Sequence, residues 1–363
     1  MKKKKYGMTV VCMTIGIMMI AVSCGGKKKE STDTEVQTAV VVETQAMNAT
    51  EAVKETESAL PAGEMYSYLT GEPVSEIIGK QRPYAIMINN IEASLPQSGV
   101  SQAEMIYEAQ VESGITRLMA VFQDVDNIEK IGSIRSARHY YIDFANDNDA
   151  IYVHYGQSKY ALSRIEDDNI MTIHGLSGYE SKVFYRSSDR KAPHNVYTTG
   201  KMLAEGLEVT GLTRDYPEGY TPRLQFNHAD TDLKDGINAQ KVNIPFDSEP
   251  YFTYNTEDGL YYRYQYGEAH IDRENDQQLT FKNIIVQYVN EKSISNQDHQ
   301  DMTLNGSGKG MYITDGKAEE ITWKRNDNAD KTKYYDASGN EISLNPGKTF
   351  FEVVSDSKTV TLE

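Results

Sequence analysis

The sequence predicts an α/β domain, with a mixed sheet and layered helices, followed by a β-rich antiparallel domain. Between residues 65 and 215, short β-branched and aromatic runs alternate with helix-like segments, which is the pattern of a sheet covered by helices. From residue 223 to residue 363, strand-like runs are separated by turn signals, which is typical of antiparallel β structure. We therefore expect one domain over residues 65–215 and a second over residues 223–363.

In the first predicted domain, the strand-like runs are rich in Val, Ile, Tyr and Phe, which favour strands. They cover residues 84–88, 105–111, 115–122, 151–155, 171–173 and 183–185. Helices are predicted between them because apolar residues recur at steps of three and four. The helical segments are residues 136–146, 158–166 and 201–206.

A boundary is predicted at residues 213–222, where two prolines and Gly219 interrupt the pattern. Turn signals such as Glu257-Asp258-Gly259 and Asp315-Gly316 then separate the strand-like runs of the second domain. These runs are residues 251–254, 260–265, 279–289, 310–315, 321–324, 333–336 and 349–354.

The sequence of the first 62 residues indicates that the protein is an exported lipoprotein. Basic residues precede an apolar run from Met8 to Val22, which is shorter than the roughly twenty residues that a spanning helix needs. Small residues before Cys24 match a lipobox, so residues 1–23 are predicted to be a signal peptide and Cys24 a lipidation site. Residues 24–62 are predicted to form a flexible tether. The expected location is the extracytoplasmic face of the cell membrane, with the lipid bilayer bound through Cys24.

Composition excludes several function classes. The chain has 37 Lys and Arg against 53 Asp and Glu, a net charge of −16, which argues against a nucleic-acid partner. Of its two cysteines, Cys12 is predicted to be removed with the signal peptide and Cys24 to be acylated. No thiol then remains for a disulfide or a zinc site. No histidine pair or acidic run has metal-ligand spacing, and no phosphate loop is complete. We expect neither a metal nor a cofactor.

The densest polar segment runs from Gly132 to Tyr141 and opens the first predicted helix. The hydroxyl of Ser133 or Ser136 could cap this helix. Arg135 and Arg138 are three residues apart and would lie on one face beside the helix N-terminus, where a carboxylate or phosphate binds well. The alternative interpretation is that both arginines form structural ion pairs with the abundant acids.

Histidines add to this candidate site. His154 follows a strand and precedes a glycine turn and a helix, which is where ligands bind in α/β sheets, although a core histidine is the commoner outcome. His194 lies in a charged loop over residues 186–195, and such loops carry function. We predict that these groups bind an anionic or hydroxyl-rich envelope ligand through Arg135, Ser136, Arg138, His139, His154, Arg190, His194 and Asn195.

Two other functions remain open at this point. A hydrolase or transferase acting on envelope polymers would use Ser136 as nucleophile, His139 or His154 as base, and Asp189 to orient the base. A protein-docking module would instead use an exposed apolar or tyrosine-rich patch on the second domain. No catalytic motif is complete in the sequence.

Several ordered motifs resemble those of the YerB-like lipoproteins, a family with paired N- and C-terminal domains. They cover roughly residues 75–363 and include Arg82-Pro83-Tyr84-Ala85-Ile86-Met87-Ile88-Asn89-Asn90, Gly114-Ile115-Thr116-Arg117, Ile134-Arg135-Ser136-Ala137-Arg138, Ala192-Pro193-His194-Asn195 and Asn345-Pro346-Gly347-Lys348-Thr349. The resemblance implies a lipoprotein of two domains whose function is unassigned. It implies no substrate and no catalytic residue.

Overall fold

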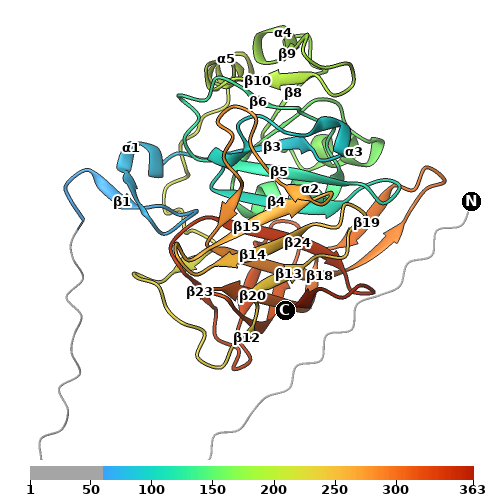
Figure 1. The fold of residues 1–363 in the computed structure, drawn as a ribbon. Coiled ribbons are helices and arrows are strands. Elements are labelled where there is room, and N and C mark those ends of the chain that lie inside the picture. The colour runs from blue at the N-terminus through green and yellow to red at the C-terminus, as the bar shows by residue number, and fades with distance from the viewer. Residues whose placement is uncertain (1–59) are drawn as a thin grey trace, which may run out of the picture. The chain divides into compact units, whose positions relative to one another are not determined.

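The protein is described by a computed structural model over residues 60–363, which centres on one sheet of twelve strands (Figure 1). The predicted signal peptide, Cys24 and all but the last residues of the predicted tether lie outside the described residues. The main path across the sheet is β12 (Ile237–Asn238), β21 (Lys317–Arg325), β20 (Gly306–Thr314), β18 (Asn283–Ser293), β24 (Thr349–Ser355), β4 (Met105–Gln110), β5 (Thr116–Phe122), β3 (Tyr84–Asn89), β7 (Ile151–His154) and β8 (Thr172–His174).

In the first half of the chain the sheet is mixed, as the sequence predicts. β3 and β4 each pair antiparallel with β5, whereas β7 and β8 continue the sheet in parallel register from β3. All residues of β3 and β5 are buried, because alternate side chains enter core layers on opposite faces of the sheet. Ile86 and Ile88 belong to one layer and Ala85 and Met87 to the other.

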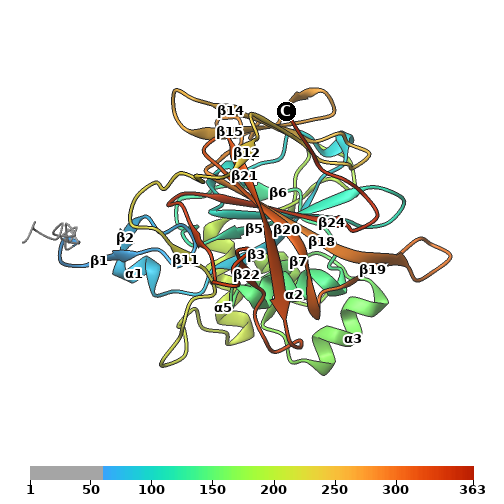
Figure 2. The same cartoon turned by 90° about the horizontal axis from the view of Figure 1, so that it is seen from below.

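Five helices accompany these strands in the described residues: α1 (Glu76–Gly79), α2 (His139–Asp147), α3 (Lys159–Asp167), α4 (Glu180–Val183) and α5 (Gly200–Thr210). α2 and α3 lie side by side (Figure 2) and pack apolar residues into the layer that contains Met87. α5 contributes Leu203 to the opposite layer. The three longer helices confirm the predicted helical segments.

The first turn of α2 differs from the prediction. Its N-cap is Arg138, which makes no side-chain capping bond, and neither Ser133 nor Ser136 caps it. The reason is that the chain reaches helical geometry only at His139, because residues 134–137 form extended backbone contacts with neighbouring segments. In contrast, Ser158 does cap α3, since its side chain accepts from the Ala161 N–H at 3.1 Å.

The second half of the chain is β-rich, which confirms the predicted class. A second sheet contains β13 (Lys241–Asn243), β14 (Tyr251–Asn255), β15 (Leu260–Gln265), β16 (Glu268–Ala269), β17 (Thr280–Phe281) and β25 (Thr361–Leu362). Its inner residues Val242, Phe252 and Tyr261 pack into the layer that contains Ile86. In the central sheet, β19 (Gln300–Thr303) pairs with β18, and β22 (Lys333–Tyr335) pairs with β21.

Short elements complete the described chain. They are β1 (Glu64–Tyr66), β2 (Pro73–Ser75), β6 (Ile131–Gly132), β9 (Tyr185–Arg186), β10 (Val196–Thr198), β11 (Gln225–Phe226), β23 (Ser343–Leu344) and the 3-10 turns Glu92–Ser94 and Val100–Gln102. β10 pairs with both β6 and β9 and so brings the two ends of the predicted ligand-binding region together.

The two halves of the chain meet inside the central sheet. β24 lies between β18 and β4 and runs parallel to both, from Thr349 beside Met105 to Val353 beside Ala109 on the β4 side. The second half is therefore not purely antiparallel, and a strand from near the C-terminus extends the sheet of the first half. The predicted domain limits, residues 65–215 and 223–363, stay predictions, but one sheet passes through both.

This junction buries charged side chains. Glu352 on β24 is the register partner of Glu108 on β4, and both are fully buried. Arg263 on β15, also fully buried, forms an ion pair with Glu108. Neither carboxyl oxygen of Glu352 has a hydrogen-bond partner among the described residues. Burial and the adjacent Glu108 raise the pKa of Glu352 well above its usual range, so Glu352 is held in its protonated form.

Replacing Glu352 by Gln should weaken the loss of stability that accompanies a rise in pH. The folded protein keeps a proton on Glu352 that the unfolded chain releases above about pH 4.3. Stability is therefore lost as pH rises above that value, by up to about 1.4 kcal/mol per pH unit. The unfolded chain of Glu352→Gln releases no proton at this position. The free energy of unfolding of the variant, measured by urea unfolding, should therefore fall less than that of the wild type between about pH 5 and about pH 8.

The matched control is Glu320→Gln, which changes an exposed glutamate on β21. It should keep the wild-type dependence of stability on pH. Equal pH dependence in Glu352→Gln and the wild-type protein would contradict a protonated Glu352.

Candidate functional site

The predicted segment around Arg135 follows β6 and is pinned by the backbone of three neighbours. Ile134 N–H donates to Val196 O at 2.7 Å, Arg135 N–H to Met87 O at 3.0 Å, and Ala137 N–H to Gly156 O at 2.9 Å. The connection therefore runs between β3, β10 and the turn after β7. This placement directs Arg135 and Arg138 to different partners.

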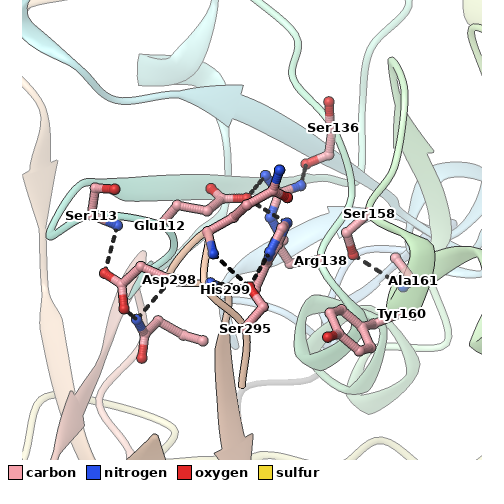
Figure 3. Close-up of polar contacts among 12 residues, drawn as sticks. Glu112, Ser113, Ser136, Arg138, Ser158, Tyr160, Ala161, Ser295, Asp298 and His299 are labelled. Carbon is pink, nitrogen blue, oxygen red and sulfur yellow. Dashed lines mark hydrogen bonds and ion pairs between the residues drawn. The ribbon is translucent and has the colours of Figure 1, made fainter. Parts of the chain in front are cut away.

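Arg138 forms an ion pair with Glu112 (Figure 3). Arg117 on β5 lies on the other side of Glu112, with 3.8 Å between Arg117 Nη2 and Glu112 Oε2. Although burial opposes ionisation, Arg138 and Arg117 hold the pKa of Glu112 below its usual range. Burial and the neighbouring Arg138 lower the pKa of Arg117 to about 9. Glu112 is thus shared by two arginines.

Arg135, Arg190 and His194 form a group that we call the cation cluster. Arg135 Nη1 donates to Pro193 O at 3.1 Å. Arg190 donates to Ala93 O at 3.2 Å and to Pro96 O at 2.7 Å. Among residues 60–363, no carboxylate lies within ion-pair distance of Arg135 or Arg190, although other arginines of the chain have such partners. The Nε of each is buried and has no acceptor in the same residue range.

His194 lies within electrostatic reach of both arginines of the cation cluster. Its Nδ1 accepts from Asn89 Nδ2 at 2.7 Å, so the ring proton resides on Nε2 in the neutral form. Burial, Arg135 and Arg190 lower the pKa of His194. The ring is therefore neutral near pH 7 and half-buried between two positive charges, and a bound anion would favour its protonation.

The other predicted residues do not join the cation cluster. His139 Nε2 lies 2.9 Å from Asp301 Oδ1. His154 is buried, with Nδ1 2.8 Å from Gly156 O and Nε2 3.0 Å from Thr172 Oγ1. Asn195 Oδ1 accepts from Arg186 Nη1 at 2.8 Å. These contacts engage the polar groups internally, except for His139 Nδ1, which is buried without a hydrogen-bond partner among the described residues. The role of these residues in ligand binding stays a prediction.

The hydrolase alternative finds no support in the contacts of Ser136. Its Oγ lies 3.2 Å from Tyr155 O, and within residues 60–363 it forms no hydrogen bond with a histidine. Asp189, predicted to orient the base, forms ion pairs with Lys130 and Arg273, each at 3.1 Å. The proposed nucleophile and orienting carboxylate thus have separate partners.

A different serine, histidine and carboxylate form a chain of contacts in space near Arg138 (Figure 3). Ser295 Oγ is 2.8 Å from His299 Nδ1, and His299 Nε2 is 3.6 Å from Glu112 Oε1. However, Ser295 Oγ also accepts the N–H groups of Gln297 and His299, each at 3.2 Å. Because these bonds occupy its lone pairs, the hydroxyl is suited to hold the β18–β19 turn and not to attack a substrate.

The docking alternative predicts an exposed apolar or tyrosine-rich patch on the second domain. In residues 60–363 the large exposed apolar side chains are scattered, and only Ile237 among them lies in the second half. No helix in the same residue range is long and apolar enough to cross a membrane.

Sequence reasoning missed Asn89, Glu112 and Arg117 as parts of this region. Each lies within or directly beside a predicted strand, and its neighbours come from distant segments. The only available signal was that Asn89 and Arg117 lie in motifs of the resemblance. Periodicity indicated a strand in both cases but could not indicate which residues it would meet.

Two family descriptions match most of the folded chain. "Protein of unknown function (DUF3048) N-terminal domain" matches residues 69–213, and the corresponding C-terminal domain matches residues 241–351. The chain is similar to "Putative lipoprotein YerB" of Bacillus subtilis (strain 168), with 29% identity over 294 residues, covering 79% of this chain and 86% of that protein. It is also similar to the crystal structure of YerB from Bacillus subtilis, with a TM-score of 0.73 and 27% identity, covering 82% of this chain and 99% of that one.

The environment of His154 predicts a loss of stability in acid. Burial lowers the pKa of His154 to about 3, whereas in the unfolded chain it is about 6.5. As pH falls below about 6.5, only the unfolded chain gains this proton, so stability should fall by about 1.4 kcal/mol per pH unit. His154→Gln should be less stable at neutral pH but should lose less of its stability between about pH 6.5 and about pH 4.5 in urea unfolding.

A suitable control is Val153→Ala, which removes buried methyl groups from the same strand without changing a titratable group. It should be destabilised and keep the wild-type pH dependence. If His154→Gln also kept the wild-type dependence of stability on pH, the neutral state assigned to His154 would be wrong.

Proposed function

Because this chain belongs to the DUF3048 family, whose description assigns no activity, we propose its function from its own residues. It is an extracytoplasmic lipoprotein that is anchored through Cys24 and binds an anionic ligand of the cell envelope at the cation cluster. The observation that carries the proposal is that Arg135, Arg190 and His194 converge while, among the described residues, neither arginine has a carboxylate within ion-pair distance.

The anchor is supported by sequence and by relationship. Residues 1–24 combine basic residues, an apolar run and a cysteine after small residues, which together direct export and lipidation. A similar protein is described as a lipoprotein. Two acyl chains on Cys24 would give stable membrane attachment. The ligand would then be met on the outer face of the membrane.

Anion binding is supported by the unused hydrogen-bonding capacity of the two arginines. A guanidinium has five N–H donors, and in the described residues Arg135 uses one of them, toward Pro193 O. Arg190 is held by two main-chain carbonyls, at Ala93 and Pro96. Carbonyls fix each side chain in place without forming an ion pair, and Glu112, the carboxylate whose charge acts on Arg135, is already paired with Arg138. A preordered guanidinium binds carboxylate or phosphate with little further loss of side-chain entropy.

Substituting either arginine should weaken anion binding. Sulfate is the probe, because its charge stays constant in the pH range of interest. Arg135→Gln and Arg190→Gln should each reduce the affinity for sulfate about tenfold, which corresponds to about 1.4 kcal/mol. The measurement is a sulfate titration of the full-length chain, followed by the NMR signals of the histidine rings.

Arg186→Gln is the matched control. Arg186 is an exposed arginine of the same loop, and its Nη1 donates to Asn195 and not to a residue of the cation cluster. It should leave sulfate affinity unchanged. The proposal fails if Arg135→Gln and Arg190→Gln bind sulfate as the wild type does, or if Arg186→Gln weakens binding equally.

Sulfate binding should become tighter as pH falls below neutrality. In the free protein, burial, Arg135 and Arg190 lower the pKa of His194. Sulfate would raise this pKa, and a ligand that raises a pKa binds more tightly to the protonated form. The affinity should therefore be higher at about pH 5.5 than at about pH 7.5. His194→Gln should bind sulfate with less pH dependence, and an unchanged dependence in this variant would assign the effect to another group.

A further inference from the structure

The pairing of β18 with its neighbours is interrupted in the second half of the chain, between its contacts with β20 and its contacts with β19. We call this interruption the opening. β18 pairs with β20 only as far as Gln287 beside Gly310, and its next paired residue is Asn290 beside Thr303 of β19. Residues 304–309 therefore face only residues 288–289. From Gly306 to Lys309, β20 pairs on one side only, with β21.

Trp323 on β21 fills part of this opening. Its indole Nε1 donates to Tyr288 O at 2.8 Å, which satisfies a carbonyl that strand pairing no longer reaches. The ring lies against Gly308, where an added Cβ would be 2.5 Å from Nε1. Because the indole occupies the space beside β20, an extra peptide strand cannot pair there. A ligand at this opening must therefore be recognised by side chains.

Two adjoining hollows lie at the opening, with volumes of about 440 and 360 Å³. Both sizes fall within the roughly 300–1,000 Å³ of ligand pockets. Tyr288, Lys309 and Thr359 line both hollows, so they share a wall. The Tyr288 hydroxyl accepts from the Val360 N–H at 3.2 Å, which fixes the orientation of the ring. Tyr288 is half-buried and lines both hollows.

Six polar side chains of the lining have no internal side-chain partner. Among the described residues, no side-chain hydrogen bond or ion pair engages Asn290, Thr303, Ser307, Lys309, Asp356 or Thr359. Hydroxyl and amide groups can both donate and accept. The charged residues of the two linings are of both signs: Lys309, Lys358, Asp356, Glu320 and Asp336. The lining thus differs in chemistry from the cation cluster, where positive charge prevails.

We propose that the two hollows form a carbohydrate-binding site that holds adjoining units of an oligosaccharide on either side of Tyr288. The C–H face of a sugar ring would pack on the phenol ring, and the uncommitted hydroxyl and amide groups would bind its hydroxyls. This carbohydrate site is separate from the proposed anion site, and neither requires the other.

The single tryptophan of the chain provides the readout, because Trp323 lines the first hollow. The full-length chain, in a detergent without a sugar headgroup, is titrated with short β-1,4 oligomers of N-acetylglucosamine and of glucose. Tryptophan emission should change saturably with at least one of them. Asn290→Ala combined with Ser307→Ala should weaken this association at least tenfold. These side chains have no internal hydrogen bond to lose, so the fold should be retained.

Asn238→Ala is the control, because Asn238 is an exposed asparagine of β12 outside both hollows. It should bind as the wild type does. The proposal is overturned if neither oligomer changes the emission up to millimolar concentration, or if the double variant binds as tightly as the wild type. It is also overturned if an extended peptide changes the emission and both oligosaccharides do not.

Discussion

Strand β24 lies in parallel register with β4 and places Glu352 beside Glu108 in the interior of the sheet. Removing charged groups from water costs several kcal/mol per ion unless partners offset the loss. Glu108 has such partners, since it pairs with Arg263 and accepts from Asn90 Nδ2 at 2.9 Å and from the Thr116 hydroxyl at 2.5 Å. Among the described residues Glu352 has no hydrogen-bond partner, and it avoids the cost by keeping its proton. Three distant segments, β4, β15 and β24, come together to form this group.

The same junction fixes loops of the first half with residues of the second. Asp272 accepts from the N–H groups of Gly99 at 3.0 Å and Ser101 at 2.8 Å. His270 Nε2 lies 2.7 Å from Gln97 Oε1, and the other ring nitrogen contacts Arg263. The carbonyl of Pro96, which accepts from Arg190, directly precedes this fixed segment. The position of the cation cluster therefore depends on contacts made by the C-terminal half.

Local structure was largely predictable from the sequence, whereas pairing between distant segments was not. The apolar run at residues 84–88 predicted β3, and the spacing of Tyr140, Tyr141 and Phe144 predicted α2. The run at residues 349–354 likewise predicted a strand, but nothing in it indicates that β4 is its neighbour. A strand presents the same alternation to any partner, so the shared sheet could not be inferred.

The candidate site was predictable to the same extent. Arg135 and Arg190 were identified as candidates because they lie in polar segments, and the pairing of β10 with β6 and β9 brings those segments together. Arg138 was identified on the same grounds, yet it faces Glu112. Its partner lies near the end of β4, and three-residue spacing on the sequence gives no information about that neighbour.

An anion would meet positive charge at the cation cluster although the whole chain carries −16. At physiological ionic strength the Debye length is about 8 Å, so exposed carboxylates elsewhere on the surface are largely screened. Arg135 and Arg190 are positioned by neutral carbonyls, and neither forms an ion pair among the described residues. His194 adds a charge only on protonation, and the two arginines oppose that protonation until an anion arrives. The local field is thus set by nearby side chains, including Arg138 and Glu112 beside Arg135, and not by the net charge.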